Sequence, residues 1–382
     1  MPSTFKGPVM TSTQTIAAVQ PYITNRLDNS VVDGRLIAGI IGDGPSQYSK
    51  SPSLWNAAFR YLNIGAVYLP FDVGAAHLAA LLGLLKADDR FLGLNVTVPH
   101  KVRVMDFLDD LDPGAKRIEA VNTIVHMPQN QLVGFNTDGA GFIESILRRQ
   151  PGRSAPFVES LNGMNVLLLG AGGSARAVAF HVAERLGSGR LLISNRTVKH
   201  AIALADAVKA NGGNAEAIHE AEITKFAPAV GLIINSTTKG QGGLRKLPDQ
   251  QATTLERYSA LAAADPPPLN RLLGGTPEIS REWHDAARSD IETNQQTSLK
   301  IAQSLPSHVH FYDLIYHPEE TIFLRHGRST GHPTMNGKAM IINQAVIALC
   351  RHLCAYELRS RSIDTPATLE QILNVMYGAW QA

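Results

Sequence analysis

Cysteine is scarce in this sequence, and its scarcity excludes one class of protein. The 382 residues include only two cysteines, Cys350 and Cys354, so the disulfide framework of a small secreted domain cannot form. The four-residue spacing places both thiols on one face of a predicted helix, which is poor geometry for a bond between them. We therefore expect two buried thiols in a reducing compartment, and a cytoplasmic protein.

An excess of either charge is also lacking. Lysine and arginine number 35 against 33 aspartate and glutamate, for a formal net charge of +2. Such a balance gives no strong field that would attract nucleic acid or an acidic membrane. No apolar run reaches the length of a transmembrane helix, and the histidines show no paired spacing with carboxylates that would suggest a metal site. We expect no nucleic-acid, membrane or metal partner, and the oligomeric state stays open.

The chain is longer than one compact core usually allows, which predicts two domains. Residues 1–35 are rich in Ser, Thr and Gln and carry few acids. A mitochondrial presequence would need a denser arginine pattern, so we expect a disordered leader instead.

Strands alternate with helices in the part that follows. The patterns predict strands at 36–42, 66–71 and 91–98 and helices at 53–62 and 75–86, with a hairpin at 123–126 and 132–135. This alternation is typical of parallel βαβ units. The first half is therefore an α/β domain.

A second α/β pattern begins at the apolar run 165–169. Strands are predicted at 165–169, 191–195, 230–235 and 309–316, with helices at 200–211, 335–352 and 368–380. Residues 241–307 have weak periodicity and many polar residues, and we expect an insertion at about 248–303 that is partly helical or partly disordered.

A glycine-rich turn follows the first of these strands and opens a helix, as in a dinucleotide-binding fold. Gly170 would make the tight turn, Gly172 would let the backbone approach a pyrophosphate, and Ala175 would allow the helix to pack on the strand. The helix N-terminus would offer N–H groups to the phosphates. The candidate residues are Gly170, Ala171, Gly172, Gly173, Ser174 and Ala175. The alternative is a glycine-rich turn of a plain βα unit.

The end of the next strand indicates which dinucleotide would bind. A site for NAD usually has an acid there, whereas this chain has Asn195-Arg196-Thr197 and then Lys199. An arginine suits the 2′-phosphate of NADP. We expect NADP, with NAD possible; the alternative is that Arg196 and Lys199 are solvated surface charges.

Several further motifs occur together in one order. They are Ser49-Lys-Ser-Pro52, Asn95-Val-Thr-Val-Pro-His-Lys101, Ala120-Val-Asn-Thr123, Asn136-Thr-Asp-Gly139, Asn235-Ser-Thr237, Tyr312-Asp-x-x-Tyr316 and Asn343-Gln-Ala345. With the glycine loop and Asn195-Arg-Thr197, their order and spacing resemble the shikimate dehydrogenase family over about residues 36–380, apart from the insertion.

The resemblance implies a fold and a reaction. The fold is two α/β domains: residues 36–137 with 338–382 bind the substrate, and residues 138–337 form a Rossmann-type NAD(P)-binding domain. The reaction is reversible hydride transfer between NADP(H) and the C–OH/C=O carbon of shikimate or 3-dehydroshikimate. Two alternatives stay open: an NAD-dependent quinate dehydrogenase, and a non-catalytic regulator that keeps the fold.

The resemblance also implies roles for individual residues. Lys101 matches the family's general acid/base and Asp138 its partner, which orients the lysine. The residues that match the family's substrate contacts are Ser49, Ser51, Thr97, Asn122, Tyr316 and Gln344. The cofactor contacts would also include Ser236, Thr237 and Gly337.

The chain departs from the family pattern in three places. Tyr48 and Trp55-Asn56 replace histidine-containing positions of the serine loop, and His200 replaces the second arginine of the NADP motif. Asn336-Gly-Lys-Ala339 replaces the usual Asp-Gly-x-Gly. These changes bear on cofactor preference and on the exact substrate.

Overall fold

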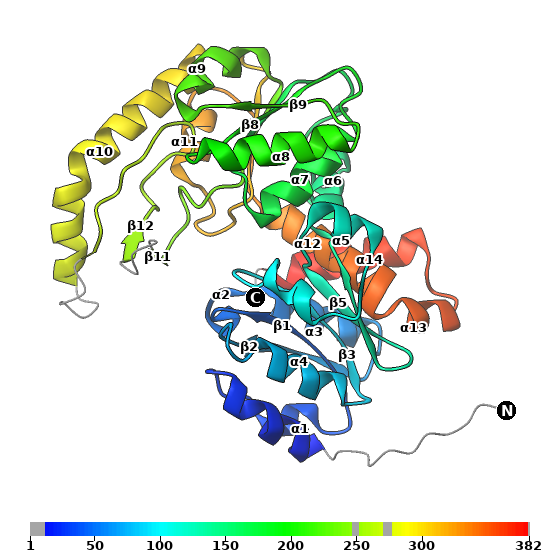
Figure 1. Ribbon diagram of the computed structural model, residues 1–382. Coiled ribbons are helices and arrows are strands. Elements are labelled where there is room, and N and C mark those ends of the chain that lie inside the picture. Colours follow the sequence, from blue (N-terminus) through cyan, green and yellow to red (C-terminus); the bar gives the residue numbers. More distant parts are fainter. Residues whose placement is uncertain (1–11, 247–251, 270–276, 381–382) are drawn as a thin grey trace. The chain divides into compact units, whose positions relative to one another are not determined.

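The computed structural model describes residues 12–246, 252–269 and 277–380. Contacts divide the chain into two compact units (Figure 1). Unit 1 comprises Met1–Phe142 and Ile341–Ala382, and unit 2 comprises Ile143–Met340. The division falls inside two helices, α6 (Asp138–Leu147) and α12 (Lys338–Ile347).

Unit 1 is built on a six-stranded mixed sheet in the order β2-β1-β3-β5-β6-β4. Strands β2, β1 and β3 are parallel, β5 is antiparallel to both β3 and β6, and β4 is parallel to β6. The strands are β1 (Leu36–Gly42), β2 (Ala66–Asp72), β3 (Phe91–Val96), β4 (Asp110–Leu111), β5 (Thr123–Met127) and β6 (Gln131–Phe135). The helices are α1 (Ser12–Val19), α2 (Pro45–Tyr48), α3 (Ser51–Tyr61), α4 (Leu78–Lys86), α5 (Pro113–Ile118), α13 (Ala355–Ser360) and α14 (Pro366–Ala379).

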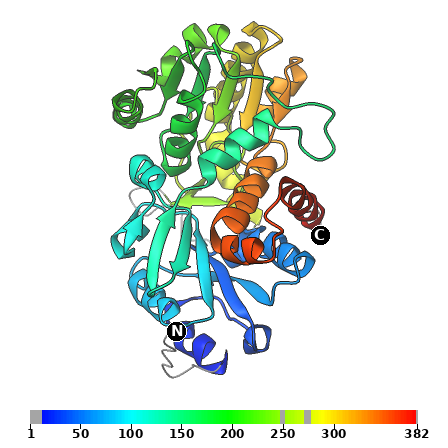
Figure 2. The same cartoon turned by 90° about the vertical axis from the view of Figure 1, so that its right-hand side faces the viewer.

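Both faces of this sheet are covered. Successive side chains of a strand point to opposite faces, so alternate residues of β1 join different apolar clusters. Ile37 and Ile41 of β1 join one apolar cluster with α1 and α4. Ala38 and Ile40 join a second cluster with α3, α12 and α14. Figure 2 shows the C-terminal helices beside α3, and the hydroxyl of Tyr61 donates to Gln371 of α14 at 2.5 Å. The end of the chain therefore completes the core of unit 1.

The expectation of a disordered leader through residue 35 was wrong from Ser12 onward. Helix α1 begins there, and Ile16, Val19 and Ile23 are buried in the first cluster. The Asn25 side chain also bonds the backbone of edge strand β2, donating to Pro70 O at 2.9 Å and accepting from Asp72 N at 2.8 Å. The buried apolar side chains of this segment and the Asn25 bonds to β2 hold it against unit 1. The polar composition of residues 1–35 did not indicate either contact. Residues 1–11 lie outside the described part.

Unit 2 is built on a parallel sheet in the order β9-β8-β7-β10-β13-β14. In chain order this is 3-2-1-4-5-6, the arrangement of dinucleotide-binding folds. The strands are β7 (Val166–Leu169), β8 (Leu191–Ser194), β9 (Ala215–Ile218), β10 (Leu232–Asn235), β13 (His310–Asp313) and β14 (Thr334–Met335). The helices are α7 (Gly173–Ala183), α8 (Val198–Ala210), α9 (Ile223–Phe226) and α11 (Ile322–Ser329). The two-domain α/β fold class is confirmed; strand β9 was not predicted, because Ala-Glu-Ala-Ile lacks a strong strand pattern.

The predicted insertion is more deeply built into unit 2 than its composition indicated. It contains strand β12 (Ala252–Thr254), which pairs with β11 (Leu244–Lys246) just before the insertion, and most of helix α10 (Pro277–Ser304), drawn yellow in Figure 1. Tyr258, Trp283 and Ile291 form a small core of its own. Leu261 and Ile301, however, belong to the main core of unit 2, so a boundary at 303 cuts through that core. The helices of the described residues include none long and apolar enough to cross a membrane.

Both cysteines lie at the C-terminal end of the fold of unit 1. A π-helical segment, Ala348–Leu353, follows α12 and contains Cys350, with Cys354 just beyond it. Both thiols are free and buried, and burial raises the pKa of each to about 12. They are therefore neutral, unreactive thiols at ordinary pH.

Candidate active site and cofactor site

A lysine from the turn after β3 forms an ion pair with an aspartate at the start of α6. Lys101 lies in the turn after β3, and Asp138 is the first residue of α6. Lys101 Nζ is 2.5 Å from Asp138 Oδ2, and the two side chains are 16% and 5% exposed. The pair thus combines a fixed carboxylate with an ammonium group that solvent or a ligand can reach. Such an ammonium can give a proton to a bound oxygen.

Asn122 holds the other oxygen of the same aspartate. Its Nδ2 donates to Asp138 Oδ1 at 2.8 Å, to Thr137 Oγ1 at 3.0 Å and to Gln344 Oε1 at 3.3 Å. Its Oδ1 accepts from Thr137 N at 2.8 Å, which fixes the amide orientation. The structure therefore brings four predicted residues, Lys101, Asp138, Asn122 and Gln344, into one network.

A glycine that was not predicted allows Gln344 to reach this network. A Cβ at Gly141 of α6 would lie 2.6 Å from both the backbone N and the Cβ of Gln344 on α12. Only a residue without a side chain lets the two helices approach so closely. The sequence signal was a glycine three residues after Asp138 within a helix, on the face that Asp138 occupies.

A buried chain of polar groups runs from Asn122 toward the serine loop. Thr123 Oγ1 donates to Asn122 Oδ1 at 3.0 Å and accepts from Asn95 Nδ2 at 3.1 Å. The Tyr68 hydroxyl donates to Asn95 Oδ1 at 2.6 Å. Burial raises the pKa of Tyr68 well above its ordinary value, and the Ser51 hydroxyl partly opposes this rise. Tyr68 therefore remains a neutral hydroxyl donor.

The remaining substrate candidates are distributed over both units. Ser51 is buried at the start of α3, and its N–H donates to Ser49 Oγ at 3.1 Å. Thr97 follows β3, and its backbone N–H donates to Ile41 O at 2.9 Å. Tyr316 is half-buried in the turn after β13 and belongs to unit 2.

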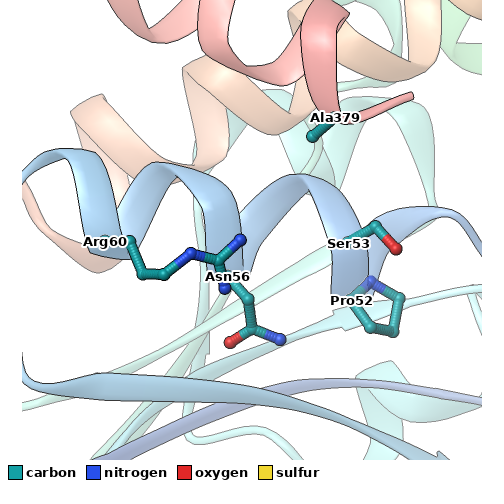
Figure 3. Close-up of a pocket in the computed structure, with 5 residues that line it drawn as sticks. All are labelled: Pro52, Ser53, Asn56, Arg60 and Ala379. Atoms are coloured by element: carbon teal, nitrogen blue, oxygen red, sulfur yellow. The ribbon is translucent and has the colours of Figure 1, made fainter. Parts of the chain in front are cut away.

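A hollow of about 370 Å³ in unit 1 is separate from these residues. It is lined by Pro52, Ser53, Asn56, Arg60 and Ala379, on α3 and α14 (Figure 3). None of the predicted site residues lines it. Among the described residues, no group of three or more His, Cys, Asp or Glu side chains gathers in a way that could hold a metal ion.

The glycine loop of unit 2 follows β7 at the point where the strand order reverses. Gly170 has φ +110°, and a Cβ there would lie 2.6 Å from Ser236 Oγ. A Cβ at Gly172 or Gly173 would meet nothing within 4 Å, and Ala175 is fully buried under the start of α7. Ala171 and Ser174 are half-buried between them. This open backbone before a helix N-terminus fits a pyrophosphate.

The loop after β10 lies against this turn and is fixed by a buried acid. Asn235 Oδ1 accepts from Thr237 Oγ1 at 2.7 Å, and Asn235 Nδ2 donates to Asp313 Oδ1 at 3.0 Å. Burial raises the pKa of Asp313 to about 7, opposed by hydrogen bonds from Thr321, Ile315 N and Asn235. The acid thus orders the loop after β10. Asp313 belongs to the motif Tyr312-Asp-x-x-Tyr316, but its burial and its bond with Asn235 were not predicted.

Gly337 packs against the turn after β13. Its N–H donates to Ile315 O at 3.0 Å, and a Cβ there would lie 2.0 Å from Leu314 O. A side chain is therefore excluded at this predicted cofactor position.

The basic residues after β8 are exposed. Asn195 Nδ2 closes the turn by donating to Thr197 O at 3.0 Å, and Thr197 precedes α8. Arg196 and Lys199 are exposed, and no ion pair or hydrogen bond from the described residues engages either side chain. Two free cations at the carboxyl end of β8 fit a 2′-phosphate better than a bare ribose hydroxyl.

Together, a Rossmann-type unit with a free basic turn and a second α/β unit with a lysine–aspartate–amide network define a dinucleotide-dependent oxidoreductase. Comparison with known proteins gives the family. Residues 40–124 match the shikimate dehydrogenase substrate binding domain, and residues 154–253 match the shikimate/quinate 5-dehydrogenase domain. The NADP(+) shikimate dehydrogenase of Desulforamulus reducens is 34% identical over 316 residues, which cover 82% of this chain and 88% of that protein. The chain therefore belongs to the shikimate/quinate dehydrogenase family, and the predicted resemblance is confirmed.

Solved structures agree with this assignment. A shikimate dehydrogenase crystallised with NADP+ has a TM-score of 0.62 and 26% identity, covering 90% of this chain and 96% of its own. The quinate dehydrogenase of Corynebacterium glutamicum, solved with NAD, shares the fold with a TM-score of 0.61 and 23% identity, covering 90% of this chain and 99% of its own.

Proposed function

We propose that this protein catalyses reversible hydride transfer between NADP(H) and shikimate, with 3-dehydroshikimate as the oxidised product. The observation that carries the proposal is the Lys101–Asp138 pair held in place by Asn122. Support also comes from relatives such as the Desulforamulus reducens protein, which is named a shikimate dehydrogenase (NADP(+)).

A bound nicotinamide would supply or accept the hydride, and the chain's own residues move the proton. In the reducing direction the carbonyl oxygen gains negative charge as hydride reaches its carbon, and the Lys101 ammonium donates a proton to that oxygen. Asp138 orients the ammonium through the contact between its Oδ2 and Lys101 Nζ. In the oxidising direction the hydroxyl proton returns to Lys101.

The neighbouring polar groups hold the substrate. A ring with several hydroxyls needs many donors and acceptors, since each buried and unpaired hydroxyl costs about 1–3 kcal/mol. We propose that Asn122, Gln344 and Thr97 bind these hydroxyls. Ser49, Ser51 and Tyr316 would bind the carboxylate.

On the cofactor side, the glycine loop 170–175 would hold the pyrophosphate. The basic turn, Asn195, Arg196, Thr197 and Lys199, would hold the 2′-phosphate. Ser236, Thr237 and Gly337 would line the remainder of the dinucleotide. We also propose that the protein works in the cytoplasm, where free thiols such as Cys350 and Cys354 persist.

Initial rates at 340 nm, with shikimate and quinate each paired with NADP and NAD, test the proposal. We expect the highest kcat/KM for shikimate with NADP. Preference for quinate with NAD would identify a quinate dehydrogenase instead, and binding without turnover in any pair would indicate a non-catalytic regulator.

Lys101→Ala tests the assigned proton donor. We expect kcat to fall by about 100-fold or more, while NADP affinity, measured by fluorescence titration, stays unchanged. Lys86→Ala is the matched control, because Lys86 forms an exposed pair with Asp109 at 2.8 Å in the same unit. Equal turnover in both variants would refute the role of Lys101.

A further inference from the structure

We infer that the buried Lys239–Glu220 ion pair is a determinant of cofactor specificity, in which Lys239 neutralises a carboxylate that would otherwise repel a 2′-phosphate beside Arg196. The inference rests on the proposed function, because it concerns the same dinucleotide site. It assigns a role to two residues that follow β10 and β9.

Lys239 is a charged residue in an unusual place. It lies in the loop after β10 and is only 7% exposed. Its ammonium group donates to the Glu220 carboxylate and to Ala262 O, the latter at 2.6 Å. A buried charge without such partners would be very unfavourable. Lys239 therefore needs Glu220, and the pair joins the ends of β9 and β10 to the inserted segment.

The backbone of Lys239 is fixed to the predicted cofactor loop. Asn235 Nδ2 donates to Lys239 O at 3.2 Å, and Lys239 N donates to Thr237 Oγ1 at 3.1 Å. In the same loop, Ser236 Oγ donates to Leu169 O at 2.7 Å, just before the glycine turn. The ion pair is thus anchored at the site where the dinucleotide would lie.

Arg196 and Glu220 follow neighbouring parallel strands at the same level. Ser194 of β8 is in register with Ile218 of β9, and Arg196 and Glu220 each lie two residues further along the chain. In agreement with this placement, burial lowers the pKa of Lys239, the Arg196 guanidinium adds to the lowering, and the carboxylates of Glu220 and Asp290 oppose it. Arg196 itself has no ion-pair partner among the described residues. It is therefore free for an anionic ligand, and the charges of Lys239 and Glu220 act on any such ligand.

The two charges of the pair largely cancel at Arg196, so the site keeps its net positive potential. Removing Lys239 leaves an unpaired carboxylate close to the 2′-phosphate, which disfavours that ligand. Removing Glu220 instead leaves an additional cation, which favours it. If the pair had a role in folding alone, its loss would change the affinities for ligands with and without a 2′-phosphate equally. The role that we infer changes the ratio of these two affinities, and the change is in opposite directions for Lys239 and Glu220.

Titration calorimetry on the full chain tests this without turnover. The probes are adenosine 2′,5′-bisphosphate and adenosine 5′-phosphate, measured with wild type, Lys239→Met, Glu220→Gln and the double variant. We expect Lys239→Met to lower the ratio of the two affinities on the order of tenfold and Glu220→Gln to raise it. The double variant should return near the wild-type ratio.

Lys209→Met is the matched control, because Lys209 forms an exposed pair with Asp206 at 3.4 Å on α8 and its loss changes the net charge equally. It should leave the ratio unchanged. If wild type prefers the bisphosphate but neither single variant alters the ratio, the inference fails and the proposed function stands. If wild type binds neither probe, the cofactor site itself is refuted. Should Lys239→Met fail to fold, a ratio in Glu220→Gln that is unchanged or lowered still overturns the inference.

Discussion

The buried carboxyl of Asp313 makes the stability of unit 2 depend on pH, and the dependence can be worked out from its surroundings. Its partners are neutral: Thr321 Oγ1 donates at 2.7 Å, Ile315 N at 2.9 Å and Asn235 Nδ2 at 3.0 Å. No cation among the described residues offsets the loss of water, and burial raises the pKa of Asp313 from 3.8 to about 7.

Whether the free energy of unfolding rises or falls with pH depends on which state, folded or unfolded, binds the proton more tightly. The unfolded chain ionises Asp313 near pH 4, whereas the folded protein keeps the proton until about pH 7. Stability that is fully present below about pH 4 is therefore lost as the pH rises toward 7. The linkage relation gives a loss of about 4 kcal/mol in all, of which about 2 kcal/mol falls between pH 5 and pH 7.

Asp313→Asn should remove this contribution while preserving the hydrogen bonds. The amide oxygen of asparagine can accept from Ile315 and Asn235, and its nitrogen can donate to the Thr321 hydroxyl. Urea unfolding of both proteins at pH 5, 6 and 7, followed by tryptophan fluorescence, gives the difference in the free energy of unfolding at each pH. We expect the wild type to lose about 2 kcal/mol relative to the variant between pH 5 and pH 7. Parallel pH profiles would refute the assignment of a raised pKa to Asp313.

Three further substitutions test the packing that the site depends on. Gly141→Ala gains about 1 kcal/mol of helix propensity but forces a Cβ to within 2.6 Å of Gln344 N; we expect a net loss of about 1–2 kcal/mol, and an unchanged melting temperature would contradict this. Gly172→Ala meets nothing within 4 Å, so we expect unchanged melting and, by calorimetry, dinucleotide affinity reduced on the order of tenfold; wild-type affinity would exclude close approach of the pyrophosphate. Asn294→Ala removes four hydrogen bonds, including that from Ser259 N. We expect it to destabilise the attachment of residues 259–263 to α10 by about 2–3 kcal/mol. Limited proteolysis at the wild-type rate would contradict this expectation.

Local patterns were enough to predict most of the regular structure. The run Val166–Leu169 followed by Gly170 to Ala175 predicted a strand, a tight turn and a helix, because each element depends on residues near it in the sequence. The prediction for the leader was wrong because its structure depends on residues that are distant in the sequence. Ile16 and Val19 are buried only because β2 and α4 offer them a surface, and composition carries no information about such a surface.

Sequence patterns were sufficient to predict the two α/β units, the glycine turn and Arg196, and the resemblance of the motifs to a known family added Lys101 and Asp138 as candidates. Which distant groups meet became known from the fold: Asn122 contacts Gln344, and Glu220 contacts Lys239. Strand order and helix packing bring these side chains together across long stretches of chain, and no local pattern records such a contact. A lone charge such as Lys239 has the same appearance in a sequence whether it is solvated or buried. Its partner, and therefore its role, exists only in the folded protein.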